Sequence, residues 1–150
     1  MESDRGAIEN LLARYCQLYD DGDLKGYAAL FEGASIDGPL GSLYGAEKVF
    51  DVQTRTCIMY DGVPRTRHVI TNLIIDIADD GLTATASCYV TIFQQTPDVP
   101  LQPIYVGQYF DELKKVEGTW RFHVRRAVPY LMGDVSHHSR HGQDSTASGT

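Results

Sequence analysis

The start of the chain carries apolar side chains at helical spacing. In a first run they recur every three or four residues, at Ile8, Leu11, Leu12, Tyr15, Leu18 and Tyr19. This period is that of an amphipathic helix with one buried stripe, and the pair Asp21-Gly22 gives the helix a place to end. A second, shorter run starts after Asp23, a good N-cap residue, and stops before Gly33. The pattern therefore predicts a helical hairpin.

The pattern then changes from helical to extended. We expect a short strand around residues 34–37, a Gly- and Pro-containing loop over 37–41, and a third helical segment over 46–59. Long extended runs follow, separated by sequences typical of tight turns, at residues 66–78, 82–95, 103–116 and 119–130. This order predicts an α+β fold in which N-terminal helices pack on the concave face of a strongly curved, mainly antiparallel sheet and leave a tapering cavity.

The chain is predicted to form one domain followed by a tail. Its 150 residues, 43% of them hydrophobic, are enough for one core without disulfides or metals. We expect this domain to cover residues 1–133. Residues 134–150 hold almost no apolar side chains, which is typical of a disordered polar tail. We interpret His137, His138 and His141 within this tail as solvated side chains rather than metal ligands.

The composition excludes several classes of partner. The 20 acidic and 13 basic residues give a formal net charge of -7, and no basic cluster interleaves with aromatic residues, so nucleic acid is not an expected partner. No apolar stretch approaches the roughly 18 residues of a membrane helix, and the polar start lacks the features of a signal peptide. We therefore expect a soluble, cytoplasmic protein with no membrane partner.

The sequence also gives no sign of a metal or a cofactor. Cys16, Cys57 and Cys88 lie far apart and form no C-x-x-C motif, which indicates buried thiols rather than disulfides or a zinc site. We find no nucleotide-binding motif and no Ser or Cys nucleophile motif. Neither a metal nor a cofactor is expected.

Two stretches of the sequence carry a resemblance to a known family. One runs from Ile8 to Leu24, and the other is Pro64-Arg-Thr-Arg-His-Val-Ile-Thr-Asn-Leu. Over about residues 5–132 the chain resembles the SnoaL-like branch of the NTF2-like superfamily. Within that branch it is similar to scytalone dehydratase, lindane dehydrochlorinase and the bile-acid 7α-dehydratase. The resemblance implies the cone-shaped NTF2-like fold.

The same resemblance implies a set of site residues. In those enzymes an Asp at the end of the first helix and a His at the start of a long strand form a dyad that removes a proton during an elimination. The matching positions here are Asp20 and His68. Tyr15 matches an active-site Tyr of the bile-acid dehydratase, which implies a catalytic role, and Tyr19 matches one of scytalone dehydratase, which implies substrate binding. One departure is that the strand at 82–95 carries no His, whereas scytalone dehydratase has a second pocket His there.

The residues themselves leave the placement of the dyad open. An imidazole and a carboxylate are suited to proton abstraction, because the carboxylate orients the ring and stabilises its protonated form. Periodicity alone does not bury Asp20, which could equally be a residue of a helix-terminal turn. Strand alternation places Thr66, His68, Ile70, Asn72 and Ile74 on one face but does not decide whether that face lines the pocket. His68 could equally be a hydrogen-bonded strand residue.

Three further residues are candidates for the pocket wall. On the last strand Trp120, Phe122 and Val124 alternate, and the same face continues to Arg126 while Arg125 points away. Arg126 is therefore predicted to form an ion pair in the pocket or at an interface. Asn72 and Tyr109 are further candidates for binding substrate.

We therefore predict a cofactor-independent lyase or isomerase acting on a small cyclic hydrophobic molecule, such as a polyketide, steroid or aromatic precursor. His68 would be the general base and Asp20 its orienting partner. The alternatives are a non-catalytic ligand-binding or assembly subunit, as in ring-hydroxylating dioxygenases, and a polyketide cyclase. Apolar residues on both faces of the strands at 66–78 and 82–95 predict a homo-dimer or homo-trimer.

Overall fold

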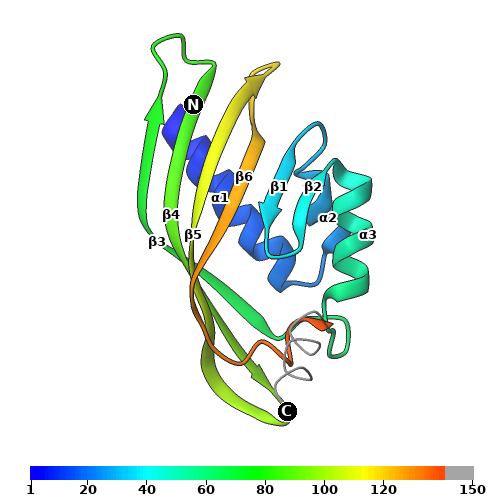
Figure 1. Ribbon diagram of the computed structural model, residues 1–150. Helices are drawn as coiled ribbons and strands as arrows, with labels where there is room; N and C mark the ends of the chain where they lie inside the picture. Colours follow the sequence, from blue (N-terminus) through cyan, green and yellow to red (C-terminus); the bar gives the residue numbers. More distant parts are fainter. Residues whose placement is uncertain (141–150) are drawn as a thin grey trace.

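The computed structural model describes residues 1–140, and within them the chain forms helices first and long strands afterwards. The elements in chain order are α1 (Asp4–Asp20), α2 (Leu24–Ala29), β1 (Ser35–Gly38), β2 (Gly41–Tyr44), α3 (Ala46–Thr56), β3 (Thr66–Ile77), β4 (Thr83–Thr96), β5 (Val99–Val116) and β6 (Thr119–Met132). Figure 1 shows the long strands strongly twisted, with α1 running diagonally across one face of the sheet.

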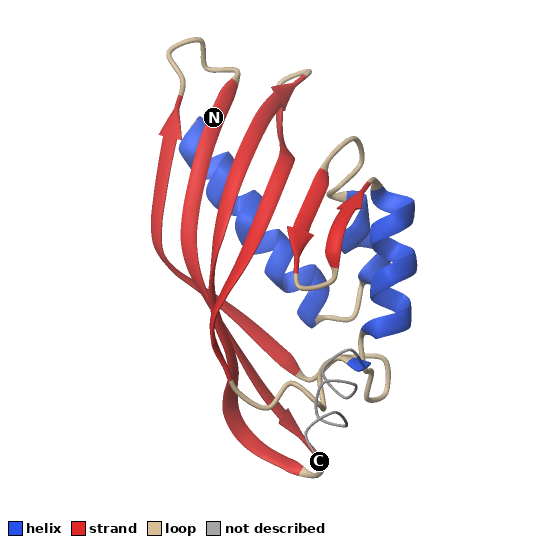
Figure 2. Cartoon of the chain, in the orientation of Figure 1, coloured by secondary structure: helices blue, strands red, loops and turns tan. Residues whose placement is uncertain are grey.

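The strands form one mixed sheet in the order β2-β1-β6-β5-β4-β3. Strands β3 to β6 follow one another as an antiparallel meander, and the short β1 joins the edge of β6 in parallel. Helices α2 and α3 lie beside the β1–β2 hairpin, as Figure 2 shows. The predicted α+β architecture, with helices packed on a curved and mainly antiparallel sheet, is confirmed.

Local signals in the sequence explain where the first two helices start and stop. The Ser3 side chain caps α1 by accepting a hydrogen bond from the Gly6 amide, and Asp23 caps α2 in the same way through the Gly26 amide. Gly22 separates the two helices with φ of +81°, a conformation that favours glycine. A Cβ at Gly22 would collide with the carbonyl oxygen of Gly62, so the end of α1 lies directly against the loop that leads into β3. This contact brings the last residue of α1 to the first residues of β3.

The core lies between α1, α2 and the inner face of the sheet. Its largest fully buried apolar side chains are Tyr27, Phe31, Ile8, Leu12, Ile104 and Leu113. Aromatic rings dominate its centre: Phe31 stacks on Phe122 with centroids 5.3 Å apart, and Tyr15 meets Tyr27 at 4.8 Å. Such aromatic pairs bury a large apolar area and fix the geometry of neighbouring side chains.

The structure departs from the predicted elements at three places. Strand β2 over residues 41–44 was not predicted, since the predicted loop ended at residue 41, and α3 ends at Thr56 rather than near residue 59. Residues 134–140 also pack on the domain, in contrast to the disordered tail predicted to begin at residue 134. The main-chain carbonyl of His137 accepts hydrogen bonds from the Tyr60 hydroxyl at 2.7 Å and from Gln94 Nε2 at 3.0 Å. The rest of the predicted tail, with His141, lies outside the described residues.

Candidate active site

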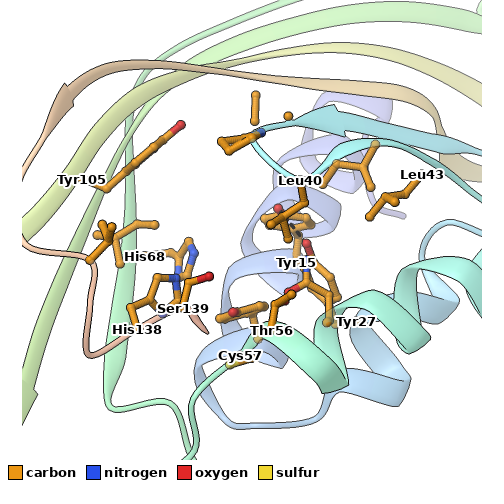
Figure 3. A pocket seen from close by; sticks show the side chains of 18 of the residues that line it. Tyr15, Tyr27, Leu40, Leu43, Thr56, Cys57, His68, Tyr105, His138 and Ser139 are labelled. Atoms are coloured by element: carbon orange, nitrogen blue, oxygen red, sulfur yellow. Dashed lines mark hydrogen bonds between the residues drawn. The ribbon is translucent and has the colours of Figure 1, made fainter. Parts of the chain in front are cut away.

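A cavity of about 350 Å³ opens between the helices and the long strands. Its wall is mostly apolar and aromatic, with a few polar groups, and Figure 3 shows the side chains from close by. The residues that line it include Tyr15, Tyr19, Tyr27, Ile36, Leu40, Leu43, Gln53, Thr56, Cys57, His68, Ile92, Tyr105, Tyr109, Ala127, Met132, Val135, His138 and Ser139. A cavity of this size, with few polar groups in an apolar wall, suits a small hydrophobic ligand.

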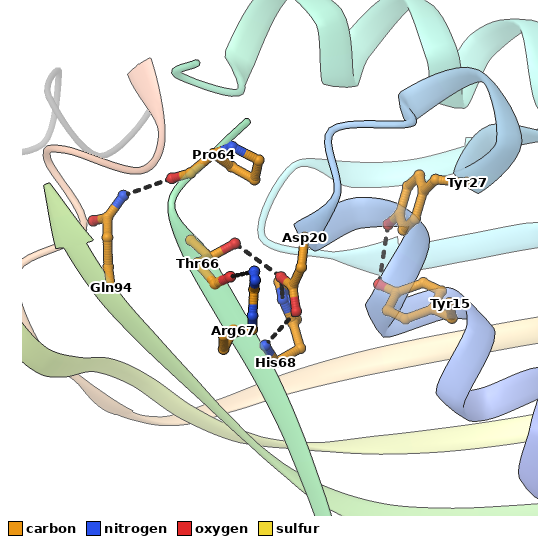
Figure 4. Close-up of polar contacts among 8 residues, drawn as sticks. All are labelled: Tyr15, Asp20, Tyr27, Pro64, Thr66, Arg67, His68 and Gln94. Atoms are coloured by element: carbon orange, nitrogen blue, oxygen red, sulfur yellow. Dashed lines mark hydrogen bonds and ion pairs between the residues drawn. The ribbon is translucent and has the colours of Figure 1, made fainter. Parts of the chain in front are cut away.

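Asp20 and His68 meet at one side of this cavity (Figure 4). Asp20 Oδ1 lies 2.6 Å from His68 Nδ1, and Asp20 Oδ2 accepts a hydrogen bond from the His68 main-chain N–H at 2.7 Å. The Thr66 hydroxyl donates a third hydrogen bond to Asp20 Oδ1 at 2.8 Å. Both side chains of the pair are only 6% exposed. The carboxylate is therefore fixed by three contacts, two of them to the histidine that it faces.

The electrostatics of the pair keep the carboxylate ionised. Burial alone would raise the pKa of the Asp20 carboxyl, but the hydrogen bonds from His68 and Thr66 and the nearby His68 ring outweigh it and hold the pKa below its ordinary value. An ionised Asp20 can accept only, so Nδ1 of His68 carries a proton. The lone pair of a neutral His68 ring is then on Nε2, which is the tautomer that a general base needs.

The tyrosines predicted for the site line the cavity. The Tyr27 hydroxyl donates to the Tyr15 hydroxyl at 3.0 Å, and burial raises the pKa of both phenols, so both stay protonated. Tyr19 packs its ring edge-on against His68, with centroids 5.1 Å apart. The ring of Tyr109, on strand β5, lies beside that of Tyr15, with centroids 5.6 Å apart. The structure thus brings Tyr15, Tyr19 and Tyr109 to one cavity with the Asp20–His68 pair.

The predicted orientation of Arg126 was wrong. The pairing of β5 with β6 shifts where Glu112 faces Val124 and Leu113 faces Phe122, so His123 is an extra residue in β6. This bulge reverses the alternation: Arg125 is turned inward and fully buried, while Arg126 is exposed on the outer face.

Arg125 supports the cavity wall without lining the cavity itself. Its guanidinium donates to both oxygens of Asp111, at 2.7 and 2.9 Å. The charged group also lies 3.9 Å from the ring centre of Tyr109 and 4.2 Å from that of Tyr15. This ion pair and its cation–π contacts fix the two phenols that face the cavity.

Simple strand alternation also gave the wrong position for the Asn72 side chain. The pairing of β3 with β4 shifts between Thr71 and Ile74, and Asn72 sits in this bulge with φ of +55°. Its side chain is exposed and does not line the cavity. After Asn72 the inward-facing residues are Leu73 and Ile75, which pack against the core.

The most important residue that sequence reasoning missed is His138. It lines the cavity from the C-terminal segment, and its ring lies 5.9 Å from that of Tyr19, centre to centre. Burial lowers the pKa of the His138 imidazole to about 4, and the nearby His68 contributes to this decrease. The polar composition around His138 gave no signal of burial, because the groups that contact it, Tyr19 of α1 and Ile58 after α3, lie far away in the sequence.

Two further observations concern metals and membranes. Within residues 1–140, no group of three or more His, Cys, Asp or Glu side chains is placed to hold a metal ion. The helices formed by these residues lack the combination of length and apolar character that a membrane span requires.

Comparisons with known proteins agree with the fold. The SnoaL-like domain matches residues 2–126. The chain is similar to the structure of a scytalone dehydratase-like protein from Novosphingobium aromaticivorans, with 26% identity, a TM-score of 0.69 and coverage of 85% of both chains. It is also similar to Aln2 from a Streptomyces species, with 26% identity, a TM-score of 0.66 and coverage of 81% of this chain and 87% of that chain.

A more distant similarity concerns the fold alone. The chain designated as the beta subunit of an aromatic-ring-hydroxylating dioxygenase from Novosphingobium aromaticivorans has 18% identity and a TM-score of 0.69, over 84% of this chain and 88% of that chain. No curated protein matches the chain.

Proposed function

The chain belongs to the SnoaL-like domain family, and we propose that it is a cofactor-independent lyase or isomerase acting on a small cyclic hydrophobic molecule. The observation that carries this proposal is the buried contact of 2.6 Å between Asp20 and His68 at the wall of an apolar cavity. A charged carboxylate that holds a histidine beside a cavity is the arrangement that general-base catalysis requires.

In the proposed reaction, His68 Nε2 takes a proton from a carbon atom of the substrate. The electron pair of that C–H bond forms a new double bond, and the leaving group departs from the neighbouring carbon in a lyase reaction. The leaving group is a hydroxyl in a dehydration, and the proton held by His68 then leaves with it as water. In an isomerase the proton returns to another carbon of the substrate.

The remaining groups of the site support this chemistry by position. Asp20 stabilises the imidazolium that forms on His68, and Thr66 keeps the carboxylate from rotating away. The protonated Tyr15 hydroxyl can donate a hydrogen bond to an oxygen of the substrate. The apolar wall favours binding of an apolar, ring-shaped molecule over binding of a strongly charged metabolite.

The second candidate is a non-catalytic ligand-binding or assembly subunit. It is favoured by exposed apolar side chains on the outer face of the sheet, which we call the outer patch: Val69, Ile74, Tyr89 and Phe110. In either case we propose that this patch is covered in a homo-oligomer, because isolated proteins rarely leave such a patch in water.

A screen of substrates tests the proposal. Ring-containing hydroxy-ketones and hydroxylated steroids are incubated with the wild-type protein and with His68→Ala, and products are detected by the absorbance of a new conjugated double bond. We expect turnover of at least one compound by the wild type and none above background by His68→Ala. Equal turnover by both proteins would show that His68 is not the base.

A further inference from the structure

The C-terminal segment 134–140 closes one side of the cavity, and main-chain hydrogen bonds hold it there. The carbonyl of His137 is bound by Tyr60 and Gln94, and the carbonyl of His138 accepts a hydrogen bond from the Ile58 amide at 3.0 Å. Ser139 pairs with Cys57 in an isolated β-bridge. Because these main-chain contacts hold the segment on both sides of His138, its ring is already in position before a ligand enters.

The ring of His138 lies at the same end of the cavity as the Asp20–His68 pair, and Figure 3 shows the two histidines side by side. Tyr19 packs edge-on against both rings, with centroids 5.1 Å from His68 and 5.9 Å from His138. His138 Nδ1 is shut off from solvent and has no hydrogen-bond partner among the described residues. The packing of residues 1–140 therefore leaves part of the hydrogen-bonding capacity of the His138 ring unused.

We propose that His138 is a second histidine of the site, whose Nε2–H donates a hydrogen bond to an oxygen atom of a ring-shaped ligand. This inference deepens the proposed function and rests on it, since it assigns, beside Tyr15, a second group that meets a substrate oxygen while His68 meets the carbon-bound proton. It also narrows the ligand class to cyclic molecules that carry a carbonyl, enol or phenol oxygen on or beside the ring.

The charge state of His138 fits a donor rather than an acid or a base. Burial, helped by the nearby His68, lowers its pKa to about 4, so the ring is neutral near pH 7 and carries one N–H and one lone pair. Because Nδ1 is shut off from solvent and His138 lines the cavity, Nε2 is the ring nitrogen left to meet a ligand, and the proposed tautomer carries its proton there. A neutral N–H beside an oxygen that gains negative charge stabilises that charge without itself losing a proton.

The alternative is that His138 merely fills space beside Tyr19. Three substitutions separate the two roles. His138→Phe keeps the flat ring and the contact with Tyr19 but has no N–H. His138→Gln places an amide N–H where the imidazole Nε2 lies, whereas His138→Asn places its amide nearer to the position of Nδ1. The matched control is His137→Phe, because the His137 side chain contacts Ser136 and Asp134 and does not line the cavity.

The experiment measures binding of 4-nitrophenol, an aromatic ring whose ionised oxygen mimics an enolate and whose absorption reports ionisation. We expect the wild type, His137→Phe and His138→Gln to bind it with similar affinity. His138→Phe and His138→Asn should bind it about tenfold more weakly or worse, the loss of one hydrogen bond to a charged oxygen. Equal affinity of wild type and His138→Phe, or no binding by the wild type, would overturn the inference.

A second measurement needs no variant, so it tests the inference even if His138→Phe fails to fold. In protein with 15N-labelled histidines, addition of 4-nitrophenol should shift the ring resonances of His138 and leave those of His137 in place, whereas an unmoved His138 would overturn the inference. Because no turnover is required, the result is independent of the test with His68→Ala. Lost turnover in His68→Ala combined with unchanged 4-nitrophenol binding in His138→Phe would keep the proposed function and remove this inference.

Discussion

At the scale of single residues, the site depends on a few polar groups held in an apolar wall. Asp20 has its oxygens occupied by Thr66 and by two nitrogens of His68, so its charge is compensated although it is buried. His138, in contrast, has no side-chain hydrogen bond at Nδ1 among the described residues. Burying a polar ring nitrogen without a partner costs free energy, and such an uncompensated cost is typical of functional positions.

The depressed pKa of His138 predicts a pH-dependent stability. In the unfolded chain a histidine titrates near pH 6.5, and in the folded protein His138 titrates at about 4, so the unfolded state binds more protons between these values. This contribution to stability is fully present above about pH 6.5 and is lost as the pH falls toward 4. By linkage, the free energy of unfolding should fall by about 2 kcal/mol from this residue between pH 7.5 and pH 5.

Urea unfolding at the two pH values checks this expectation. His138→Phe should remove that part of the decrease, because phenylalanine cannot bind a proton. The carboxyl of Asp20 does not interfere, since its lowered pKa confines its own contribution to more acidic conditions. An identical decrease in wild type and His138→Phe would mean that the imidazole is not buried in solution.

At the scale of the elements, the junction between α1 and β3 positions the candidate dyad. Gly22 has φ of +81° and lies against the Gly62 carbonyl, which keeps the end of α1 beside the start of β3. Gly22→Ala adds both left-handed strain and a steric clash, so we expect a loss of about 2–4 kcal/mol in the free energy of unfolding. Gly33→Ala is the matched control, because Gly33 has φ of +67° but no atom within 4 Å of an added Cβ.

Chemical denaturation of the two variants gives the comparison. Gly33→Ala should lose only the backbone term, about 1 kcal/mol. Gly22→Ala should also weaken 4-nitrophenol binding, because the Asp20–His68 pair at the cavity wall shifts with the end of α1. Equal losses of stability in the two variants would argue against a tight junction at Gly22.

The elements also show which parts of the fold the sequence could predict. Apolar period and caps predicted α1 and α2, and long extended runs separated by turn residues predicted β3 to β6. Alternation failed at the two bulges, since one extra residue turns every following side chain to the other face. That is why Arg126 rather than Arg125 was expected to continue the face of Trp120 and Phe122, and why Asn72 was expected in the pocket.

The remaining errors have a different physical origin. Strand β2 is four residues long and begins with Gly41 and Ser42, so its own sequence carries little β-propensity and its formation depends on pairing with β1. Residues 134–140 are polar and are ordered by hydrogen bonds to distant main-chain and side-chain groups. Tyr15, Tyr19, Asp20 and His68 were placed by a helical stripe and by two family motifs, and all but Asp20 line the cavity directly. Tyr109 also lines the cavity, although no sequence signal of its own pointed to it.

At the scale of the whole molecule, the outer patch predicts self-association. Tyr89 and Phe110 are 46% and 38% exposed on neighbouring strands, next to the exposed Val69 and Ile74. Light scattering at micromolar concentration should therefore report a dimer or trimer. The double substitution Tyr89→Lys and Phe110→Lys should give a monomer, because it puts charges in the patch.

A matched control for this prediction is Tyr44→Lys, since Tyr44 is 69% exposed but lies on β2, away from the outer patch. It should leave the oligomer intact. A monomeric wild-type protein at this concentration would contradict the expected assembly.

The central claim is that His68 acts as a general base with Asp20 as its orienting partner, and the most direct measurement is kcat/KM of four proteins on one substrate identified in the screen. We expect His68→Ala to lose nearly all activity and Asp20→Asn to lose at least about tenfold, since asparagine keeps the shape but not the charge that stabilises the imidazolium. Asp21→Asn, at the neighbouring exposed carboxylate, should match the wild type. Full activity in His68→Ala, or equal losses in Asp20→Asn and Asp21→Asn, would contradict the account.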